Sequence, residues 1–129
     1  MGDRAMPERI ELRDTVDRAA AIKRLRLVEP YAIGNAGAED MAHGCHLLDV
    51  LEDGNVIGSV SIEIDGTDAV MHAASGRMAS FGGHLDLVES VLRSKGVKRF
   101  GVATRRPGLV RRMLAHGYGI TRCELEKDL

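Results

Sequence analysis

The sequence predicts a single α/β domain covering residues 1–129. A chain of 129 residues lies in the size range of one domain and buries about two-thirds of its unfolded surface. Hydrophobic residues make up 44% of the chain and the net charge is −1, which favours a packed core over disorder. Strand-like and helix-like patterns alternate along the chain without repeats, so we expect a mixed sheet flanked by helices.

The chain begins with a predicted strand and helix. Apolar and charged residues alternate over 10–13, the period of a short strand. Asp14 or Thr15 then provides a helix cap, and the helix is expected to continue to about Leu27. The stretch 34–44, rich in Gly and Ala, predicts a loop.

A hairpin is the clearest local signal in the sequence. Two apolar runs, 45–51 and 56–64, flank the turn sequence Asp53-Gly54-Asn55, whose residues tolerate a positive φ. In the second run the core face is expected to carry Val56, Gly58, Val60, Ile62 and Ile64. The opposite face carries Ser59, Ser61 and Glu63, and we expect it to line a site.

The second half predicts a strand, helix, strand, helix and strand in that order, over 69–74, 85–92, 100–104, 107–116 and 120–125. A loop of small residues, 75–83, precedes the first of these helices. Gly96 and Gly117 are placed to end the two helices, and Pro107 to start the second.

The charges separate by position. Residues 27–76 contain no Lys or Arg, whereas residues 90–123 contain no Asp or Glu. The two halves are either solvated surfaces that attract each other or a partner, or a site with one cationic and one anionic ligand. A protein partner or a homodimer is compatible with either interpretation.

Several classes of protein are disfavoured. The balanced charge and only four aromatic residues argue against nucleic-acid binding, and no apolar run is long enough to cross a membrane. Two cysteines and no secretion signal predict a cytoplasmic protein. His43, Cys45 and His46 suggest a metal site, but a fourth ligand is missing and strand alternation separates Cys45 from His46, so we expect none.

The order of elements resembles the GNAT (general N-acetyltransferase) superfamily, whose acyl-CoA N-acyltransferase fold is a mixed sheet holding acyl-CoA between two splayed strands. The resemblance covers nearly the whole chain. It is carried by residues 10–13 before a helix, the hairpin at 51–58, the helix-to-strand junction at 96–100 and the helix end at 114–118. A non-catalytic relative is the alternative, similar to compact phage versions of the fold.

The resemblance places a pyrophosphate-binding loop after the fourth strand. The residues it assigns to acetyl-CoA are His72, Ala73, Ala74, Arg77, Met78, Ala79, Ser80, Phe81, Gly82, Gly83 and Arg106. The loop matches the family pattern at Arg77 and Gly82, but Ser80 replaces its first glycine. The competing interpretation of residues 77–83 is a loop that binds nothing. The competing interpretation of Arg105 and Arg106 is that they lie at a solvated helix start.

Acetyl transfer to an amine also needs a base, because the attacking nitrogen must lose a proton. Glu63 on the third strand and His72 on the fourth are the candidate catalytic residues, unless they are ordinary surface or sheet residues. The Tyr that often protonates the leaving thiolate in this family falls on Met113, which has no proton to donate. The sequence thus favours an acetyl-CoA-dependent N-acetyltransferase that acts on a cationic amine such as a lysine side chain, with a binding or structural protein as the alternative.

Overall fold

The computed structural model describes residues 8–31, 36–76, 81–122, 125 and 127–128. Five strands form one sheet in the order β1 (Ile10–Asp14), β2 (His46–Glu52), β3 (Asn55–Asp65), β4 (Asp68–Gly76) and β5 (Arg99–Val102). The helical segments are α1 (Arg18–Leu25), the 3-10 helix η1 (Arg26–Tyr31), α2 (Ala38–Ala42), α3 (Phe81–Ser94) and α4 (Pro107–Ala115). Neighbouring strands are antiparallel except β4 and β5, which are parallel, so the expected mixed sheet flanked by helices is confirmed.

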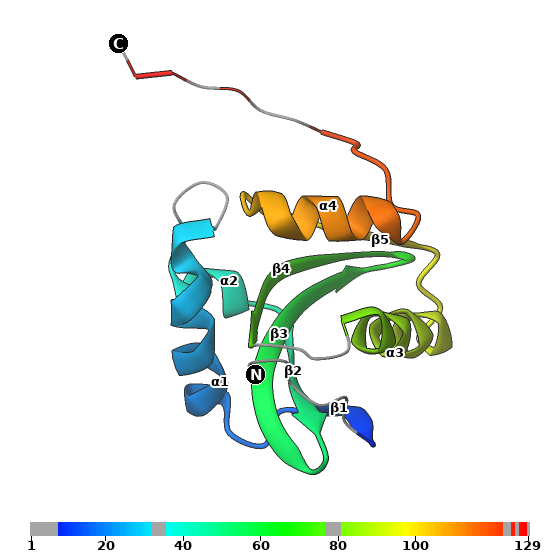
Figure 1. Ribbon diagram of the computed structural model, residues 1–129. Coiled ribbons are helices and arrows are strands. Elements are labelled where there is room, and N and C mark those ends of the chain that lie inside the picture. Colours follow the sequence, from blue (N-terminus) through cyan, green and yellow to red (C-terminus); the bar gives the residue numbers. More distant parts are fainter. Residues whose placement is uncertain (1–7, 32–35, 77–80, 123–124, 126, 129) are drawn as a thin grey trace, which may run out of the picture.

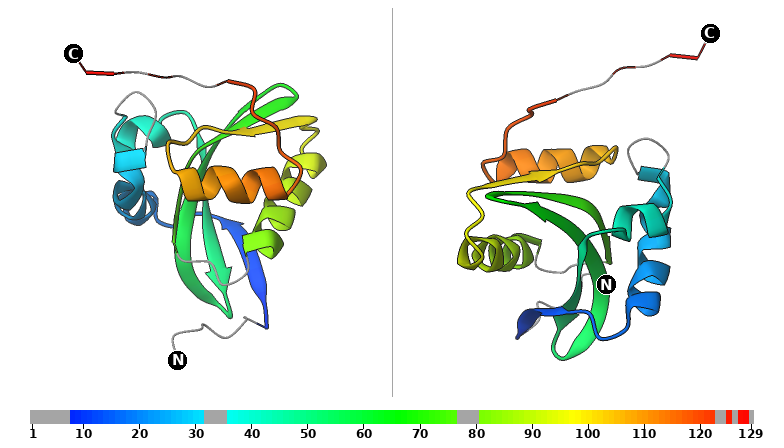
Figure 2. Two further views of the ribbon diagram at one scale, coloured as in Figure 1. Left: turned by 45° about the horizontal axis from the view of Figure 1, so that its top comes forward. Right: turned by 180° about the vertical axis from the view of Figure 1, so that it is seen from behind.

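Helices cover both faces of the sheet (Figure 1). Figure 2 shows α1 and α2 on one face and α3 on the opposite face, with α4 near β5. Because both faces are covered, six of the seven residues of β2 are buried. None of the described helices is long and apolar enough to cross a membrane.

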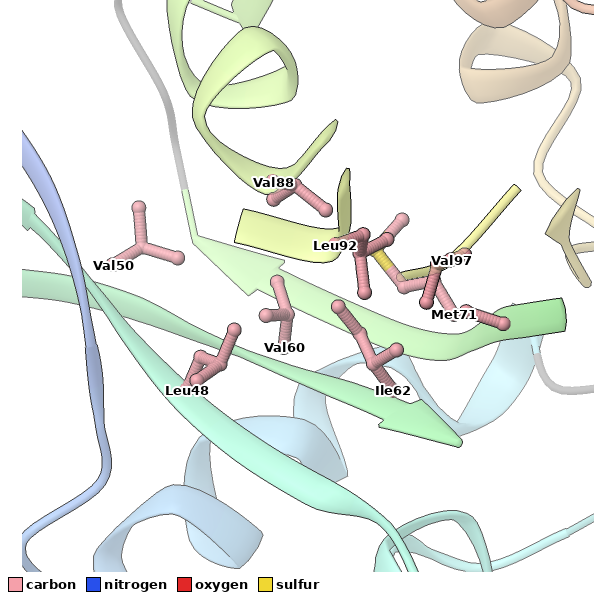
Figure 3. Packing of buried hydrophobic residues seen from close by; sticks show 9 residues of the cluster. Leu48, Val50, Val60, Ile62, Met71, Val88, Leu92 and Val97 are labelled. Carbon is pink, nitrogen blue, oxygen red and sulfur yellow. The ribbon is translucent and has the colours of Figure 1, made fainter. Parts of the chain in front are cut away.

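Two hydrophobic clusters hold these layers together. On the α3 face, the cluster contains Leu48, Val50, Val60, Ile62, Ala69, Met71, Val88, Leu92 and Val97 (Figure 3). On the other face, the cluster contains Ala21, Leu25, Ala38, Met41, Ala42, Leu47 and Ala73. The alternation predicted for 56–64 is confirmed at Val60 and Ile62, which lie on the α3 face. Each cluster fixes helices to the sheet by burial of apolar area.

The hairpin between β2 and β3 forms as predicted. Asp53 and Gly54 have φ values of 52° and 82°, the left-handed conformation that a two-residue hairpin turn requires. Near the start of β3, the backbones of β3 and β4 approach so closely that a Cβ on Gly58 would lie 1.8 Å from the carbonyl oxygen of Ser75. A Cβ on Gly76, whose φ is 116°, would lie 2.4 Å from the carbonyl oxygen of Ile57. Glycine is therefore required at both positions.

The N-terminal helix begins later than predicted. Asp14 and Thr15 do not cap it, because Asp14 pairs with Leu48 in the sheet and the Thr15 N–H donates to the carbonyl oxygen of Leu47. The cap is Asp17, whose Oδ1 accepts a hydrogen bond from the Ala20 N–H at 3.1 Å.

Three further predictions differ from the structure. The stretch predicted as a loop, 34–44, contains α2, whose buried face has helical spacing. The strand predicted over 100–104 ends at Val102, because the chain leaves β4 there to enter α4. The strand predicted over 120–125 is not formed in its described residues: residues 120–122 lie outside the sheet, and Ile120 is 65% exposed. Its few apolar residues, among charged ones, give it little to bury.

Candidate active site

Strands β4 and β5 part at Met71. β4 and β5 pair from Asp68 with Arg99 up to Met71 with Val102, and the Ala103 N–H then donates to the Met71 carbonyl oxygen at 3.1 Å. Beyond this point β5 no longer pairs with β4, so the edge of β4 has no strand partner among the described residues. Backbone N–H and C=O groups along such an edge are available to a ligand.

A hollow opens where these strands part, and we call it the strand hollow. It is lined by Val28, Tyr31, Met71, His72, Ala73, Ala74, Val102, Ala103, Thr104, Arg106 and Leu109. Most of this lining is apolar. The Arg106 guanidinium carbon lies 5.5 Å from the centre of the Tyr31 ring, a cation–π contact that joins the start of α4 to η1.

A second hollow adjoins the first, and we call it the acidic hollow. It is lined by Ala36, Asp40, Met41, His43, Cys45, Glu63, His72 and Ala103. Its charged residues are acidic apart from the two histidines, and it shares His72 and Ala103 with the strand hollow. Two hydrogen bonds hold the α2 side of this hollow in place: the Ser61 hydroxyl donates to the Met41 carbonyl oxygen, and the Arg18 guanidinium donates to that of Ala42.

His72 and Glu63 are hydrogen-bonded to each other between the two hollows. His72 Nε2 lies 2.9 Å from Glu63 Oε1, and the two side chains are 34% and 56% exposed. Met71 pairs with Ile62 and Ala73 with Ser61, so His72 is the extra residue of a β-bulge in β4. The bulge turns the His72 side chain toward Glu63. The structure thus brings together the two residues that the sequence proposed separately as bases.

The other polar residues predicted on the Glu63 face are not available to a ligand. Ser59 and Ser61 are fully buried, because α1 and α2 cover that part of the sheet. Ser59 accepts a hydrogen bond from Arg24, and Ser61 donates one to α2. The prediction that this face lines a site is therefore wrong for the two serines, whereas Glu63 lies beyond the covered region.

Much of the acidic half also serves the fold. Asp49 is 2% exposed and forms ion pairs with Arg13 at 3.2 Å and Arg24 at 3.5 Å. The Arg26 guanidinium donates to Glu39 at 2.7 Å, and this hydrogen bond lowers the pKa of the Glu39 carboxyl. The acids that line a hollow are Asp40 and Glu63.

The proposed pyrophosphate loop lies partly outside the described residues. Arg77, Met78, Ala79 and Ser80 belong to the part that is not described, as does the side chain of Phe81. Gly82 and Gly83 lie in the first turn of α3. A Cβ on Gly82 would lie 3.0 Å from His116 Nε2, so this glycine allows the end of α4 to approach the start of α3.

Two other side chains do not supply an acid. Met113 is 5% exposed and packs inside, as its position in the helical pattern predicted. The Tyr118 hydroxyl donates to Glu89 Oε2 at 2.6 Å, and burial, followed by this hydrogen bond, raises the pKa of Tyr118. Its proton is therefore held outside both hollows.

The three residues considered as metal ligands are not gathered. His43 and Cys45 line the acidic hollow, whereas His46 is exposed on β2. Within the described ranges, no group of three His, Cys, Asp or Glu side chains is arranged to hold a metal ion.

Sequence reasoning missed the contributions of η1 and α2. Tyr31 and Val28 reach the strand hollow from η1, and Asp40 and Met41 reach the acidic hollow from α2. A signal for α2 was present: the buried residues Ala38, Met41 and Ala42 have the i, i+3, i+4 spacing of a short helix. No comparable pattern indicated η1.

Comparison with solved structures decides the fold. A protein from Xanthomonas campestris belonging to the GNAT family matches with a TM-score of 0.59 and 17% identity, over 97% of this chain and 96% of that one. The chain has the GNAT fold. The aminoglycoside N-acetyltransferase AAC(6')-Iy bound to a CoA bisubstrate analogue matches with a TM-score of 0.56 and 14% identity, over 95% of this chain and 99% of that one. A transcriptional regulator from Bacillus halodurans matches with a TM-score of 0.60 and 11% identity, over 94% of this chain and 100% of that one. No protein-family model and no curated protein matches the sequence of this GNAT-fold chain.

Proposed function

We propose that the protein transfers an acetyl group from acetyl-CoA to a cationic amine. The observation that carries this proposal is the pair of adjoining hollows that meet at His72. An acyl transfer between two substrates needs two binding sites that share one reacting point. The GNAT fold, and a fold neighbour that was solved with CoA bound, support CoA as the carrier of the acyl group.

The strand hollow is the proposed site for the acyl end of acetyl-CoA. Its apolar lining suits an alkyl thioester, and the open edge of β4 offers backbone groups to the amides of the pantetheine arm, as when a peptide is added to a sheet edge. His72, Ala73 and Ala74 lie on this edge, and Arg106 supplies positive charge. The pyrophosphate is assigned to residues 77–83, where the N-terminus of the 14-residue helix α3 favours an anion.

The acidic hollow is the proposed site for the acceptor. Asp40 and Glu63 line it, and neither Lys nor Arg is among its described lining residues. A negative potential attracts an ammonium group, such as that of a lysine side chain or a small amine. The amine must then lose a proton before it can attack the thioester.

The His72–Glu63 pair is the proposed base. When Glu63 accepts the proton on Nε2 of His72, the other ring nitrogen, Nδ1, carries the lone pair that takes a proton from the amine. Glu63 is also placed to act directly or through water, since it lines the same hollow. In both cases the base lies where the two substrates meet.

Calorimetric titration with acetyl-CoA, followed by a thiol-release assay with a panel of amines, tests the proposal. We expect binding, and release of CoA with at least one cationic amine. Gly82→Val should abolish binding while the circular dichroism spectrum stays native. Because the new side chain also displaces His116, His116→Ala is the matched control and should retain most of the affinity. Binding of acetyl-CoA without turnover of any amine would favour a binding or structural role over catalysis.

A further inference from the structure

Acyl transfer from a thioester leaves a thiolate that must be protonated. The position expected to supply this proton is Met113, a thioether buried in the core, and the proton of Tyr118 is held by Glu89. The thioester is proposed to bind in the strand hollow, so another residue of that hollow must protonate the thiolate. The described lining residues of the hollow include two that carry a hydroxyl group, Tyr31 and Thr104.

Tyr31 is the stronger acid of these two, because a phenol loses its proton far more readily than an alcohol. Thr104 is occupied in the α4 turn, where its Oγ1 accepts the Arg106 N–H at 3.0 Å. Tyr31 ends η1 and is held against the α4 start by two contacts. Its ring lies under the Arg106 guanidinium, and its carbonyl oxygen accepts the Arg105 N–H at 3.0 Å.

The surroundings of Tyr31 suit proton transfer. The nearby Arg106 cation stabilises negative charge in the hollow, whether it develops on the thioester sulfur or on the phenol oxygen. Tyr31 is 41% exposed, so its phenolate can recover a proton from water after each turnover. His72 lines the same hollow from β4, which places a base and an acid around one cavity.

We propose that Tyr31 is the catalytic acid that protonates the leaving thiolate of CoA, an inference that rests on the proposed function. The His72–Glu63 pair takes one proton from the ammonium group and passes it to water. The neutral nitrogen then forms a bond to the carbonyl carbon and gives its second proton to the same pair. As the C–S bond breaks, its electron pair goes to sulfur, which takes the proton of the Tyr31 hydroxyl. Tyr31 is reprotonated by water and the base releases its second proton to water, so the products are the amide, the free thiol and one proton.

Tyr31→Phe is the decisive variant, because it keeps the ring and the contact with Arg106 and removes only the hydroxyl. We expect kcat for CoA release to fall about 100-fold or more, within the usual contribution of a general acid. The affinity for acetyl-CoA, measured by calorimetry, should stay within about twofold. Tyr118→Phe is the matched control and should leave kcat and its pH profile unchanged, since Tyr118 lies outside both hollows.

The possible failures are distinguishable. If wild-type protein releases CoA and Tyr31→Phe does so at the same rate, the role of Tyr31 is overturned and the proposed function stands. If Tyr31→Phe loses affinity for acetyl-CoA in proportion to kcat, the hydroxyl binds the substrate and the assignment as acid is also overturned. If wild-type protein turns over no amine, both proposals fail.

Discussion

His84 and Glu52 form a hydrogen-bonded pair inside the protein, with His84 Nε2 2.9 Å from Glu52 Oε2. Their side chains are 3% and 4% exposed. The pair joins the first turns of α3 to the end of β2, and the other ring nitrogen of His84 has no hydrogen-bond partner among the described residues. The His84–Glu52 pair therefore ties helix α3 to the sheet.

Loss of one partner of this pair should destabilise the fold. Glu52→Ala leaves a buried imidazole without its partner, and we expect the free energy of unfolding in urea to fall by about 2–4 kcal/mol. Glu63→Ala is the matched control, because the Glu63 side chain is 56% exposed in its own pair with a histidine and should cost about 1 kcal/mol or less. Equal losses in the two variants would contradict this role of burial.

Gly76→Ala should be far more harmful than an alanine placed at an open glycine. The new Cβ would collide with the backbone of Ile57, and the residue would also keep a φ of 116°. We expect a loss of about 3 kcal/mol or more, read from thermal and urea unfolding. Gly108→Ala is the comparison, because a Cβ there meets nothing within 4 Å in helix α4 and should be neutral or stabilising by up to about 1 kcal/mol.

Tyr118 should make stability depend on pH in the alkaline range. Burial and the bond to Glu89 raise the pKa of Tyr118 above its ordinary value of 10.0 in the folded state. The contribution is therefore fully present below about pH 10 and is lost as the pH rises through the folded pKa. Tyr118→Phe should remove this dependence and cost about 1 kcal/mol at neutral pH. The tyrosinate absorbance of wild-type protein minus that of the variant gives the titration of Tyr118, which should lie above pH 10.

Replacement of His72 and replacement of Glu63, the two members of the proposed base, should lower turnover by different amounts. His72→Gln removes the nitrogen that accepts the proton and should lower turnover at neutral pH by about 100-fold, with the deficit shrinking as the free amine deprotonates at higher pH. Glu63→Gln keeps a hydrogen-bond acceptor for His72 and should lower turnover less, with acetyl-CoA affinity unchanged. A larger loss in Glu63→Gln than in His72→Gln would assign the base to Glu63. Thiol release across pH is the measurement.

The sequence predicted the sheet and the long helices because their signals are local. The turn at Asp53 and Gly54, the apolar stripe of α3 and the helix-ending Gly96 each depend on a few neighbouring residues, and each is found in the structure. The site was harder to predict because its walls come from segments distant in the chain. Glu63 and His72 were identified, but that they touch depends on a bulge that alternation in β4 does not reveal.

The environments of the other site residues followed from packing. Ser59 and Ser61 have the pattern of an exposed face, but α1 and α2 bury them. Tyr31 belongs to η1, whose sequence has no helical periodicity, so its arrival at the strand hollow was not predictable from local signals.

The bulge at His72 gives β4 one residue more than its pairing with β3 requires. Deletion of His72 would make Met71 and Ala73 sequence neighbours. Because these two residues already pack on opposite faces of the sheet, regular pairing with β3 would keep their side chains on their present faces. A chain without His72 should therefore keep the sheet and lose the contact with Glu63, which separates the fold of β4 from the chemistry proposed for it.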